Sequence, residues 1–178
     1  MTPVYYLMIS ALGMNGTNTL SELSRTLHNC GCTLLNTKIN ALGNDLAAFF
    51  FVSGNWGAIA KMEAALPNLR KRLGLNIQAL RSEESKKQVP EMPYSLQVVA
   101  IDRGGILTEI TNFLEKSDVS IDEISVHTYA THTKTRMISL NLKISVPETQ
   151  HLATLRDKIM GYCDDNNFDG FIEPLRNV

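Results

Sequence analysis

Hydrophobic residues recur along the first half of the chain with two different periods, and these periods predict strands and helices. Residues 4–11 form an apolar run that is typical of a strand. Leucines three or four positions apart between residues 20 and 27 share one face of a predicted helix, and apolar residues between 59 and 69 predict a second helix in the same way. Strands are predicted on either side of the tight-turn pair Gly43-Asn44. The predicted order is strand, helix, strand, strand, helix and strand, at residues 4–11, 20–27, 33–42, 45–53, 59–69 and 76–81.

Single residues predict where these helices begin and end. Thr19 and Glu22 have the spacing of a capping box, in which a hydroxyl at the helix start and a carboxylate three residues later satisfy each other's backbone amides. Gly31 predicts the end of the same helix. In the second helix we expect Trp56 to pack the first turn onto the sheet. We expect Pro67 to kink or end that helix, because proline lacks the amide donor.

The second half of the chain repeats the first half at a constant offset. Asp102 lies 102 − 15 = 87 positions after Asn15, and this offset aligns two turn-forming loops, the helices that follow them and the next strands. Such a long internal repeat indicates two copies of one structural unit. The aligned pairs include Leu20 with Leu107, Glu22 with Glu109, Leu23 with Ile110, Leu27 with Leu114 and Ile39 with Val126.

The repeated order is that of the ferredoxin-like arrangement. We therefore expect an α+β protein of two tandem ferredoxin-like βαββαβ domains, each an antiparallel four-stranded sheet with its helices on one face. The polar segment between the halves carries mixed charges and ends in prolines, which is typical of an exposed linker. The predicted boundaries are residues 1–82 for the first domain, 83–92 for the linker and 93–178 for the second domain.

Two strands differ in what they predict about the outer face of each sheet. Residues 48–52 are apolar at every position, so both faces of this strand are expected to be covered, the outer one by the second copy or by another subunit. Residues 138–146 alternate between apolar and polar, so that strand is expected to have one solvated face. Exposed sheet edges and the strand with two apolar faces together favour a homodimer.

Composition and charge are those of an ordinary globular protein. The 178 residues are 44% hydrophobic and 20% charged, with a formal net charge of −1. A nearly neutral chain lacks the basic surface that nucleic-acid-binding domains usually carry, so direct contact with DNA is not expected. No apolar run is long enough to span a membrane, and no secretory signal precedes the first strand. Three cysteines suit a reducing compartment, so we expect a cytoplasmic protein.

The chemical motifs favour binding over catalysis. No nucleophile elbow, phosphate loop or metalloprotease helix is present. The spacing of His28, Cys30 and Cys32 differs from that of a metal knuckle, so free cysteines are expected there, and neither a metal nor another cofactor is predicted. An RNA-binding role would need exposed aromatic and basic residues on the central strands, and residues 138–142 offer no aromatic side chain.

The loop of the second half resembles a known motif. Its sequence, Asp102-Arg103-Gly104-Gly105-Ile106, is similar to the Asp-Arg-Pro-Gly-Ile motif of the ACT domain, a small regulatory module that binds amino acids, with Gly104 in place of the proline. The loop of the first half, Asn15-Gly16-Thr17-Asn18, lacks both charges of that motif. The chain also contains the segments Ser10-Ala11-Leu12-Gly13, Cys30-Gly31-Cys32, Leu42-Gly43 and Ser53-Gly54. With these segments the chain as a whole resembles the glycine cleavage system transcriptional repressor family, whose members are two ACT domains in tandem.

In ACT proteins the ligand lies near the loop after the first strand, often at an interface between two domains, and the resemblance implies the same location here. The chemistry of the loops fits an amino acid, because amides at a helix N-terminus attract a carboxylate. Asp102 suits an α-ammonium group, and Arg103 suits a carboxylate. The candidate ligand-binding residues are Asn15, Gly16, Thr17, Asn18, Asp102, Arg103, Gly104, Gly105 and Ile106.

These observations predict a non-catalytic regulator that binds a small amino acid, with glycine as the candidate that the resemblance implies. Members of the resembled family repress glycine-cleavage genes by antagonising a DNA-bound activator, so the expected partner is a DNA-binding regulatory protein. One alternative is a ligand-free ACT-like adaptor that acts on a metabolic enzyme, which the uncharged first loop favours. Another is a small acylphosphatase-like hydrolase in which Arg103 holds an acyl phosphate, an idea that depends on analogy of fold alone.

Overall fold

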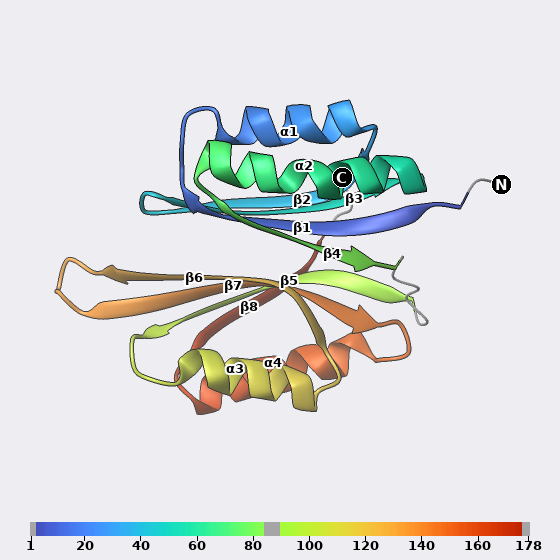
Figure 1. Cartoon of the computed structure of the whole chain (residues 1–178). Helices are drawn as coiled ribbons and strands as arrows, with labels where there is room; N and C mark the ends of the chain where they lie inside the picture. The colour runs from blue at the N-terminus through green and yellow to red at the C-terminus, as the bar shows by residue number, and fades with distance from the viewer. Residues whose placement is uncertain (1–2, 84–89, 176–178) are drawn as a thin grey trace. The chain divides into compact units, whose positions relative to one another are not determined.

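The computed structural model describes residues 3–83 and 90–175, and the chain divides into two compact units between residues 86 and 87. Each unit contains one four-stranded antiparallel sheet and two helices that cover one face of it (Figure 1). The predicted fold class is therefore confirmed. Residues 84–89 of the predicted linker lie outside the described residues.

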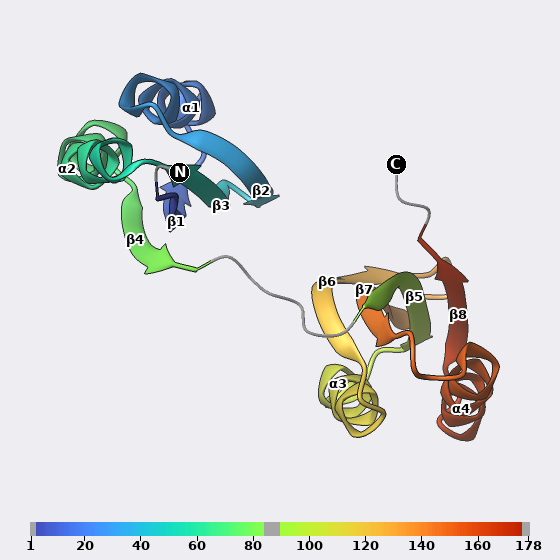
Figure 2. The same ribbon diagram turned by 90° about the vertical axis from the view of Figure 1, so that its right-hand side faces the viewer.

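The elements of the first unit are β1 (Tyr5–Met14), α1 (Thr19–Cys30), β2 (Thr33–Leu42), β3 (Asp45–Gly54), α2 (Trp56–Leu73) and β4 (Asn76–Ser82). The strand order is β2-β3-β1-β4, so β1 and β3 are the central strands. The two helices lie side by side on the same face of this sheet (Figure 2).

The elements of the second unit are β5 (Glu91–Ile101), α3 (Ile106–Lys116), β6 (Ser120–Ala130), β7 (Arg136–Pro147), α4 (Leu152–Asp165) and β8 (Asp169–Pro174). The strand order is β6-β7-β5-β8, which is the order of the first unit with each number raised by four. The internal repeat seen in the sequence is thus a repeat of topology. Strand β5 begins at Glu91, within the segment expected to be linker.

Each unit has a separate hydrophobic core between its sheet and its helices. In the first unit, alternate residues of β1 such as Leu7 and Ile9 are buried against apolar residues of α1 and α2 such as Leu23 and Met62. In the second unit, even-numbered residues from 94 to 100 in β5 and from 138 to 146 in β7 are buried in the same way. The two cores hold the loops after β1 and β5 at the same place in each unit.

The start of α1 differs from the prediction. The helix begins at Thr19 with Asn18 as its N-cap, and no side chain makes a capping hydrogen bond there. The carboxylate of Glu22 binds the arginines Arg25 and Arg72 instead. The predicted capping box is therefore wrong, because an ion pair is a stronger partner for a carboxylate than a backbone amide already near solvent. Gly31 ends the helix in the left-handed conformation (φ 78°), as predicted.

Helix α2 differs from the prediction at Trp56, and it does not end at Pro67, where a kink or an end was expected. It passes through Pro67 and continues to Leu73, since buried Leu66 and Leu69 hold the helix against the core on both sides of the proline. Trp56 is 62% exposed, so it does not pack the first turn onto the sheet. The side chain of Asn55 caps that turn by accepting a hydrogen bond from the backbone N–H of Ala58 at 2.8 Å.

The outer faces of the two sheets differ in character. In the second unit the alternation predicted for residues 138–146 holds as far as Lys143, because Leu140 and Leu142 are buried while Asn141 and Lys143 are exposed. Ser145 departs from it, since it is buried and its hydroxyl donates to Oδ2 of Asp122 at 2.6 Å. In the first unit Phe49 lies on the outer face and is 48% exposed in the single chain. Coverage of that face by another molecule therefore stays a prediction.

Candidate functional site

The candidate ligand-binding loop of the second unit connects β5 to α3. Gly105 is the N-cap of α3 and adopts a left-handed conformation (φ 94°) that other residues rarely adopt. No side chain caps the helix, so the first amides of α3 have no side-chain acceptor. A helix N-terminus in this state suits an anionic group such as a carboxylate.

Arg103 of this loop is held inside its own unit. Its two terminal nitrogens donate to the two carboxylate oxygens of Glu109 on α3, at 2.6 and 2.7 Å. The guanidinium carbon also lies 5.5 Å from the centre of the Phe168 ring, at a cation–π distance. The hydrogen bonds from Arg103 lower the pKa of the Glu109 carboxyl. The fork that the sequence offered to a ligand carboxylate is thus already occupied.

A small aromatic cluster supports this ion pair. Tyr162 on α4 stacks on Phe113 with 4.2 Å between ring centres and meets Phe168 edge-on at 6.5 Å. Its hydroxyl donates to the backbone carbonyl of Glu109 at 3.4 Å. Burial, followed by the nearby carboxylate of Glu109, raises the pKa of Tyr162. The cluster therefore joins the loop to α3, to α4 and to the start of β8.

Asp102 is anchored to the first residue of β7. Its backbone N–H donates to the carbonyl of Arg136 at 2.9 Å, and its Oδ2 lies 3.0 Å from the Arg136 guanidinium. The carboxylate is largely shielded, since only 20% of the Asp102 side chain is exposed. A ligand ammonium at Asp102 would therefore share the carboxylate with an arginine.

The corresponding loop of the first unit, residues 15–18, connects β1 to α1 and is exposed. The backbone N–H of Asn15 donates to the carbonyl of Asn44 at 2.9 Å, and that of Thr19 donates to the carbonyl of Gly16 at 3.1 Å. Asn18 is the N-cap without a side-chain hydrogen bond to the helix. This loop presents uncapped helix amides without any charged side chain.

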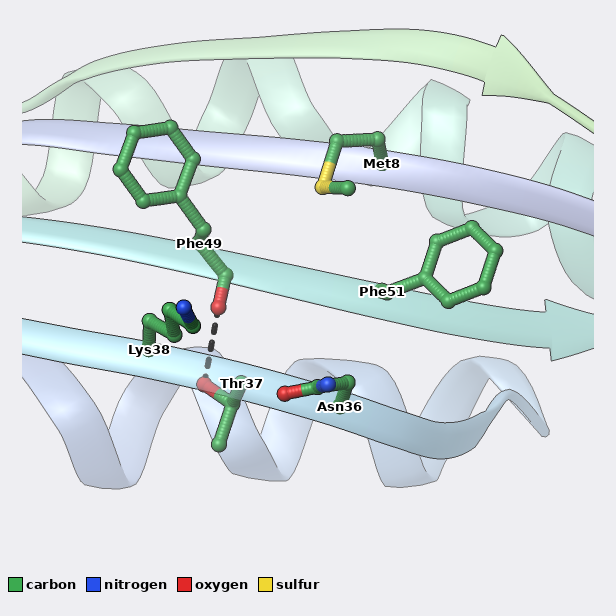
Figure 3. A pocket seen from close by; sticks show the side chains of 6 residues that line it. All are labelled: Met8, Asn36, Thr37, Lys38, Phe49 and Phe51. Carbon is green, nitrogen blue, oxygen red and sulfur yellow. Dashed lines mark hydrogen bonds between the residues drawn. The ribbon is translucent and has the colours of Figure 1, made fainter. Parts of the chain in front are cut away.

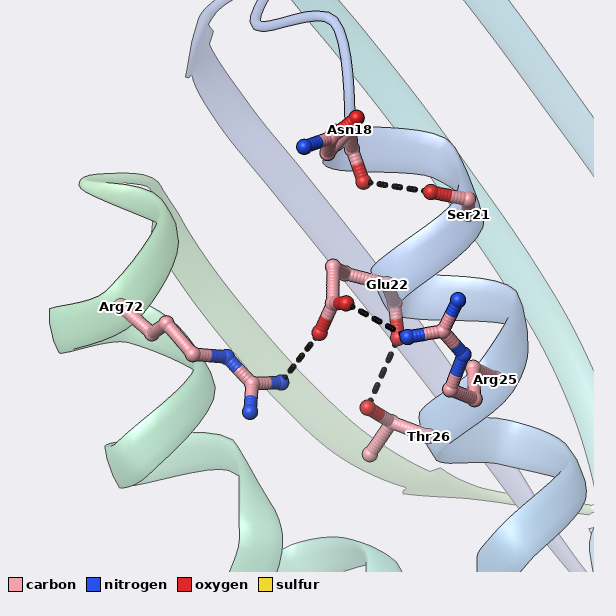
Figure 4. Close-up of polar contacts among 6 residues, drawn as sticks. All are labelled: Asn18, Ser21, Glu22, Arg25, Thr26 and Arg72. Carbon is pink, nitrogen blue, oxygen red and sulfur yellow. Dashed lines mark hydrogen bonds and ion pairs between the residues drawn. The ribbon is translucent and has the colours of Figure 1, made fainter.

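Glu22 holds the place in the first unit that Glu109 holds in the second, at the same offset of 87. Its Oε1 lies 2.9 Å from Arg25 on the next turn of α1, and its Oε2 lies 2.7 Å from Arg72 at the end of α2 (Figure 4). Both repeats thus place a glutamate–arginine pair beside the loop. The arginine comes from the loop in the second unit and from the helices in the first.

Sequence reasoning did not single out Glu109, Arg136 or Phe168 as parts of the site. Glu109 aligns with Glu22 in the internal repeat, and a carboxylate present at this position in both repeats could have marked it as part of the site. Nothing in the sequence near Arg136 or Phe168 marked them, because each reaches the loop from a distant strand or helix end. Among the residues that the structure describes, none of the candidate residues 15–18 in the first loop is paired with a charged side chain.

The groups considered for metal binding form no site in the described part of the chain. Within residues 3–83 and 90–175, no group of three or more His, Cys, Asp or Glu side chains is placed to hold a metal ion. Cys30, Cys32 and Cys163 are free, and burial raises the pKa of all three thiols, that of Cys163 to about 11. None of the helices within the same ranges is long and apolar enough to cross a membrane.

A hollow of about 330 Å³ lies on the outer face of the first sheet (Figure 3). Met8 of β1 and Phe49 and Phe51 of β3 form its apolar wall. Asn36, Thr37 and Lys38 of β2 form its polar side, and the Thr37 hydroxyl donates to the Phe49 carbonyl at 2.9 Å. The hollow borders the Met8–Phe51 and Ser10–Phe49 rungs, several residues before β1 ends at the loop, and sequence reasoning did not identify it as a cavity.

Comparison with known proteins finds relatives of both units. Residues 5–79 and residues 90–162 each match the ACT domain. Over 175 residues the chain is 25% identical to the glycine cleavage system transcriptional repressor of Escherichia coli K12, and the match covers 96% of this chain and 90% of that protein. The repressor of the same name from Shigella flexneri matches with equal identity and coverage.

Solved structures with the same two-unit architecture extend this likeness. The crystal structure of a candidate glycine cleavage system transcriptional repressor has a TM-score of 0.79 at 19% identity, covering 98% of this chain and 99% of the other. A protein of unknown function from Galdieria sulphuraria has a TM-score of 0.76 at 18% identity, covering 98% of this chain and all of the other. At these identities the likeness concerns the fold.

Proposed function

This chain belongs to the ACT-domain family, and from that premise we propose that it is a non-catalytic cytoplasmic regulator that binds a small amino acid and controls transcription through a partner protein. The relative at 25% identity is a glycine cleavage system transcriptional repressor, and the match spans almost the whole of both chains. Glycine is therefore the first ligand to test, and genes of glycine cleavage are the first targets. The contact with DNA is assigned to a DNA-binding partner, since the chain has a net charge of −1.

The observation that carries the proposal is the state of the loop after β5. Gly105 begins α3 in a conformation that leaves the first amides without a side-chain cap, so a ligand carboxylate has donors there. The shielded carboxylate of Asp102 precedes those amides by a few residues and suits an α-ammonium. Arg103 stabilises the loop instead of binding the ligand, because both of its terminal nitrogens donate to Glu109.

The first loop is the weaker half of this proposal. Asn15, Gly16, Thr17 and Asn18 supply backbone and amide groups but no charge. They suit a zwitterion only through neutral hydrogen bonds and the dipole of α1. We therefore assign the tighter site to Asp102, Gly104, Gly105 and Ile106 of the second unit.

Isothermal titration calorimetry of the full chain against single amino acids tests the proposal. We expect heat from glycine or another small amino acid, and we expect Asp102→Asn to weaken binding by at least about tenfold through loss of the ammonium partner. Arg136→Gln is the matched control, because it removes the other partner of Asp102 and keeps the carboxylate. Silence for every amino acid at millimolar ligand, or equal affinity in Asp102→Asn, contradicts the amino-acid site.

The second candidate function is a ligand-free adaptor, and one observation favours it. Asp102 and Arg103 both have partners within the chain, so the loop is stable without a ligand. This candidate expects calorimetry to be silent and expects capture of a metabolic enzyme that added amino acids do not change. The hydrolase alternative finds no support in the geometry, because the Arg103 fork that would hold an acyl phosphate binds Glu109.

A further inference from the structure

The outer face of the first sheet is broad, apolar and almost uncharged. The strand register places alternate residues of β1, β2, β3 and β4 on this face. Among those strand positions, Lys38 and Asp45 are the two that carry a formal charge. Its large apolar side chains are Tyr6, Met8, Leu12, Met14, Leu42, Phe49, Phe51 and Leu80.

Much of this apolar surface is open to solvent in the single chain. The exposed fraction is 48% for Phe49, 55% for Leu12 and 71% for Leu80. Scattered apolar residues are common on protein surfaces, but a contiguous apolar patch across the two central strands of a sheet is typical of an interaction surface. The patch therefore needs an explanation beyond the fold.

The second unit shows that the fold itself does not require such a face. Ser10 and Phe49 are paired across β1 and β3, and Gln97 and Asn141 hold the corresponding pair across β5 and β7. One rung away on β7, Lys143 forms an ion pair of 3.1 Å with its β6 neighbour. The middle of the two central strands is thus polar in the second repeat and apolar in the first. The second face still carries exposed Ile101 at the end of β5 and exposed Phe171 on edge strand β8.

We propose that two copies of the chain pack the outer faces of their first sheets against each other, about a twofold axis parallel to the strands and between β1 and β3. Four strands about 4.8 Å apart, of which three are about 33 Å long and β4 is about 23 Å long, present roughly 600 Å² per copy. The total of roughly 1,200 Å² reaches the lower end of the range for stable protein interfaces. A twofold arrangement uses one surface patch twice, so it closes at the dimer.

The pairing of large and small side chains across β1 and β3 fits this axis. Leu12 lies opposite Ala47, and Phe49 lies opposite Ser10. Rotation about the axis places each β1 residue of one copy over a β3 residue of the other copy. The two residues are the ones that pair with each other within a single sheet. On these two rungs each copy therefore places a large side chain over a small one, which is how packed sheets interdigitate, while on the next rung Met8 lies over Phe51.

The charges agree with the same arrangement. Lys38 shares a rung with Gln78 at the opposite edge of the sheet, through Phe49 and Ser10. The axis therefore brings Lys38 over Gln78 of the second copy and keeps the two lysines apart. No like charges oppose each other across the centre of the interface.

Two other occupants fit the face less well. A single-stranded nucleic acid would stack on exposed aromatics of central strands, but its phosphates need a positive groove, and Lys38 is the one cation that the register places on this face. A small apolar ligand would fill the hollow of about 330 Å³ beside Met8, yet it would leave Leu12 and Leu80 exposed. A second copy covers all of the patch.

Sedimentation velocity of the full chain from low to high micromolar concentration tests the proposal. The wild-type chain is expected to form a dimer, and Phe49→Glu and Leu12→Glu are each expected to raise its dissociation constant by at least about tenfold. Asn141→Glu is the matched control, because Asn141 holds the rung of Phe49 in the second sheet. Its dimer is expected to be unchanged.

Far-UV circular dichroism and urea midpoints check that the variants are folded. Leu12 is more than half exposed, so Leu12→Glu keeps the test valid if Phe49→Glu misfolds. A monomeric wild type, a dimer that ignores both variants, or equal dissociation by Asn141→Glu overturns the proposal. Retention of single-stranded RNA by a wild-type monomer overturns it in favour of nucleic acid. None of these outcomes depends on amino-acid binding, which calorimetry measures separately.

Discussion

Arg103 and Glu109 form a bidentate ion pair, in which each terminal guanidinium nitrogen donates to one carboxylate oxygen, at 2.6 and 2.7 Å. The pair joins the loop after β5 to the first turn of α3. It fixes where the backbone amides of that loop point, so its role in ligand binding is positional.

The Arg103–Glu109 pair is expected to make stability depend on pH. Arg103 lowers the pKa of Glu109 in the folded chain, so the contribution of the pair is complete above the unfolded value of about 4.3 and is lost as pH falls through the lower folded value. Arg103→Gln should therefore be less stable than wild type at neutral pH and equal to it in acid. Urea unfolding across this range measures the difference.

Glu109→Gln provides the control for that prediction. In its background the further change Arg103→Gln should add no pH-dependent difference, because the titrating group is gone. A constant difference between wild type and Arg103→Gln from neutral pH to acid would show that the arginine acts through Phe168 packing alone.

Gly105→Ala is expected to destabilise the chain by about 1–2 kcal/mol, because alanine is strained at a φ of 94°. Gly104→Ala is the matched control, since its added methyl group meets open space and its φ is not left-handed. Urea midpoints of the two variants test this difference. Equal midpoints would show that the loop can change its conformation at no cost. The proposed ligand site should be lost in Gly105→Ala, because the same backbone conformation orients the first amides of α3.

Gly170→Ala is expected to cost about 1–3 kcal/mol through overpacking. Its added Cβ would lie 2.7 Å from the sulfur of buried Cys163 on α4. The double variant with Cys163→Ala should recover part of the loss, as a double-mutant cycle would show. Gly161→Ala on the exposed side of the same helix should instead stabilise the chain by about 0.5–1 kcal/mol.

Pro67→Ala is expected to raise the free energy of unfolding by roughly 1–3 kcal/mol. Pro67 lies in the interior of α2 and is exposed, so alanine restores an amide donor without disturbing the core. Asn68→Ala, at the next exposed position, gains only helix propensity of about 0.5 kcal/mol. Thermal or urea unfolding compares the two. Similar gains in both variants would mean that the helix already bends to accommodate the proline.

Much of the fold could be predicted because its signals are local. The tight turn at Gly43-Asn44, the helix stop at Gly31 and the alternation on β7 as far as Lys143 depend on residues close in sequence, and all three agree with the structure. Helix ends were less predictable, because the choice of partner for Glu22 depends on Arg72 at the end of another helix. The continuation of α2 beyond Pro67 likewise depends on burial that no local rule contains.

The sequence by itself determined the duplication, the topology of each unit and the position of the two loops, since hydrophobic period and turn chemistry act over short stretches. The tertiary structure alone decided what the loop side chains contact. Asp102 reaches Arg136 and Arg103 reaches Phe168, in both cases across elements far apart in the chain. Charged side chains have several partners within reach in any sequence, and packing of the strands and helices selects one of them.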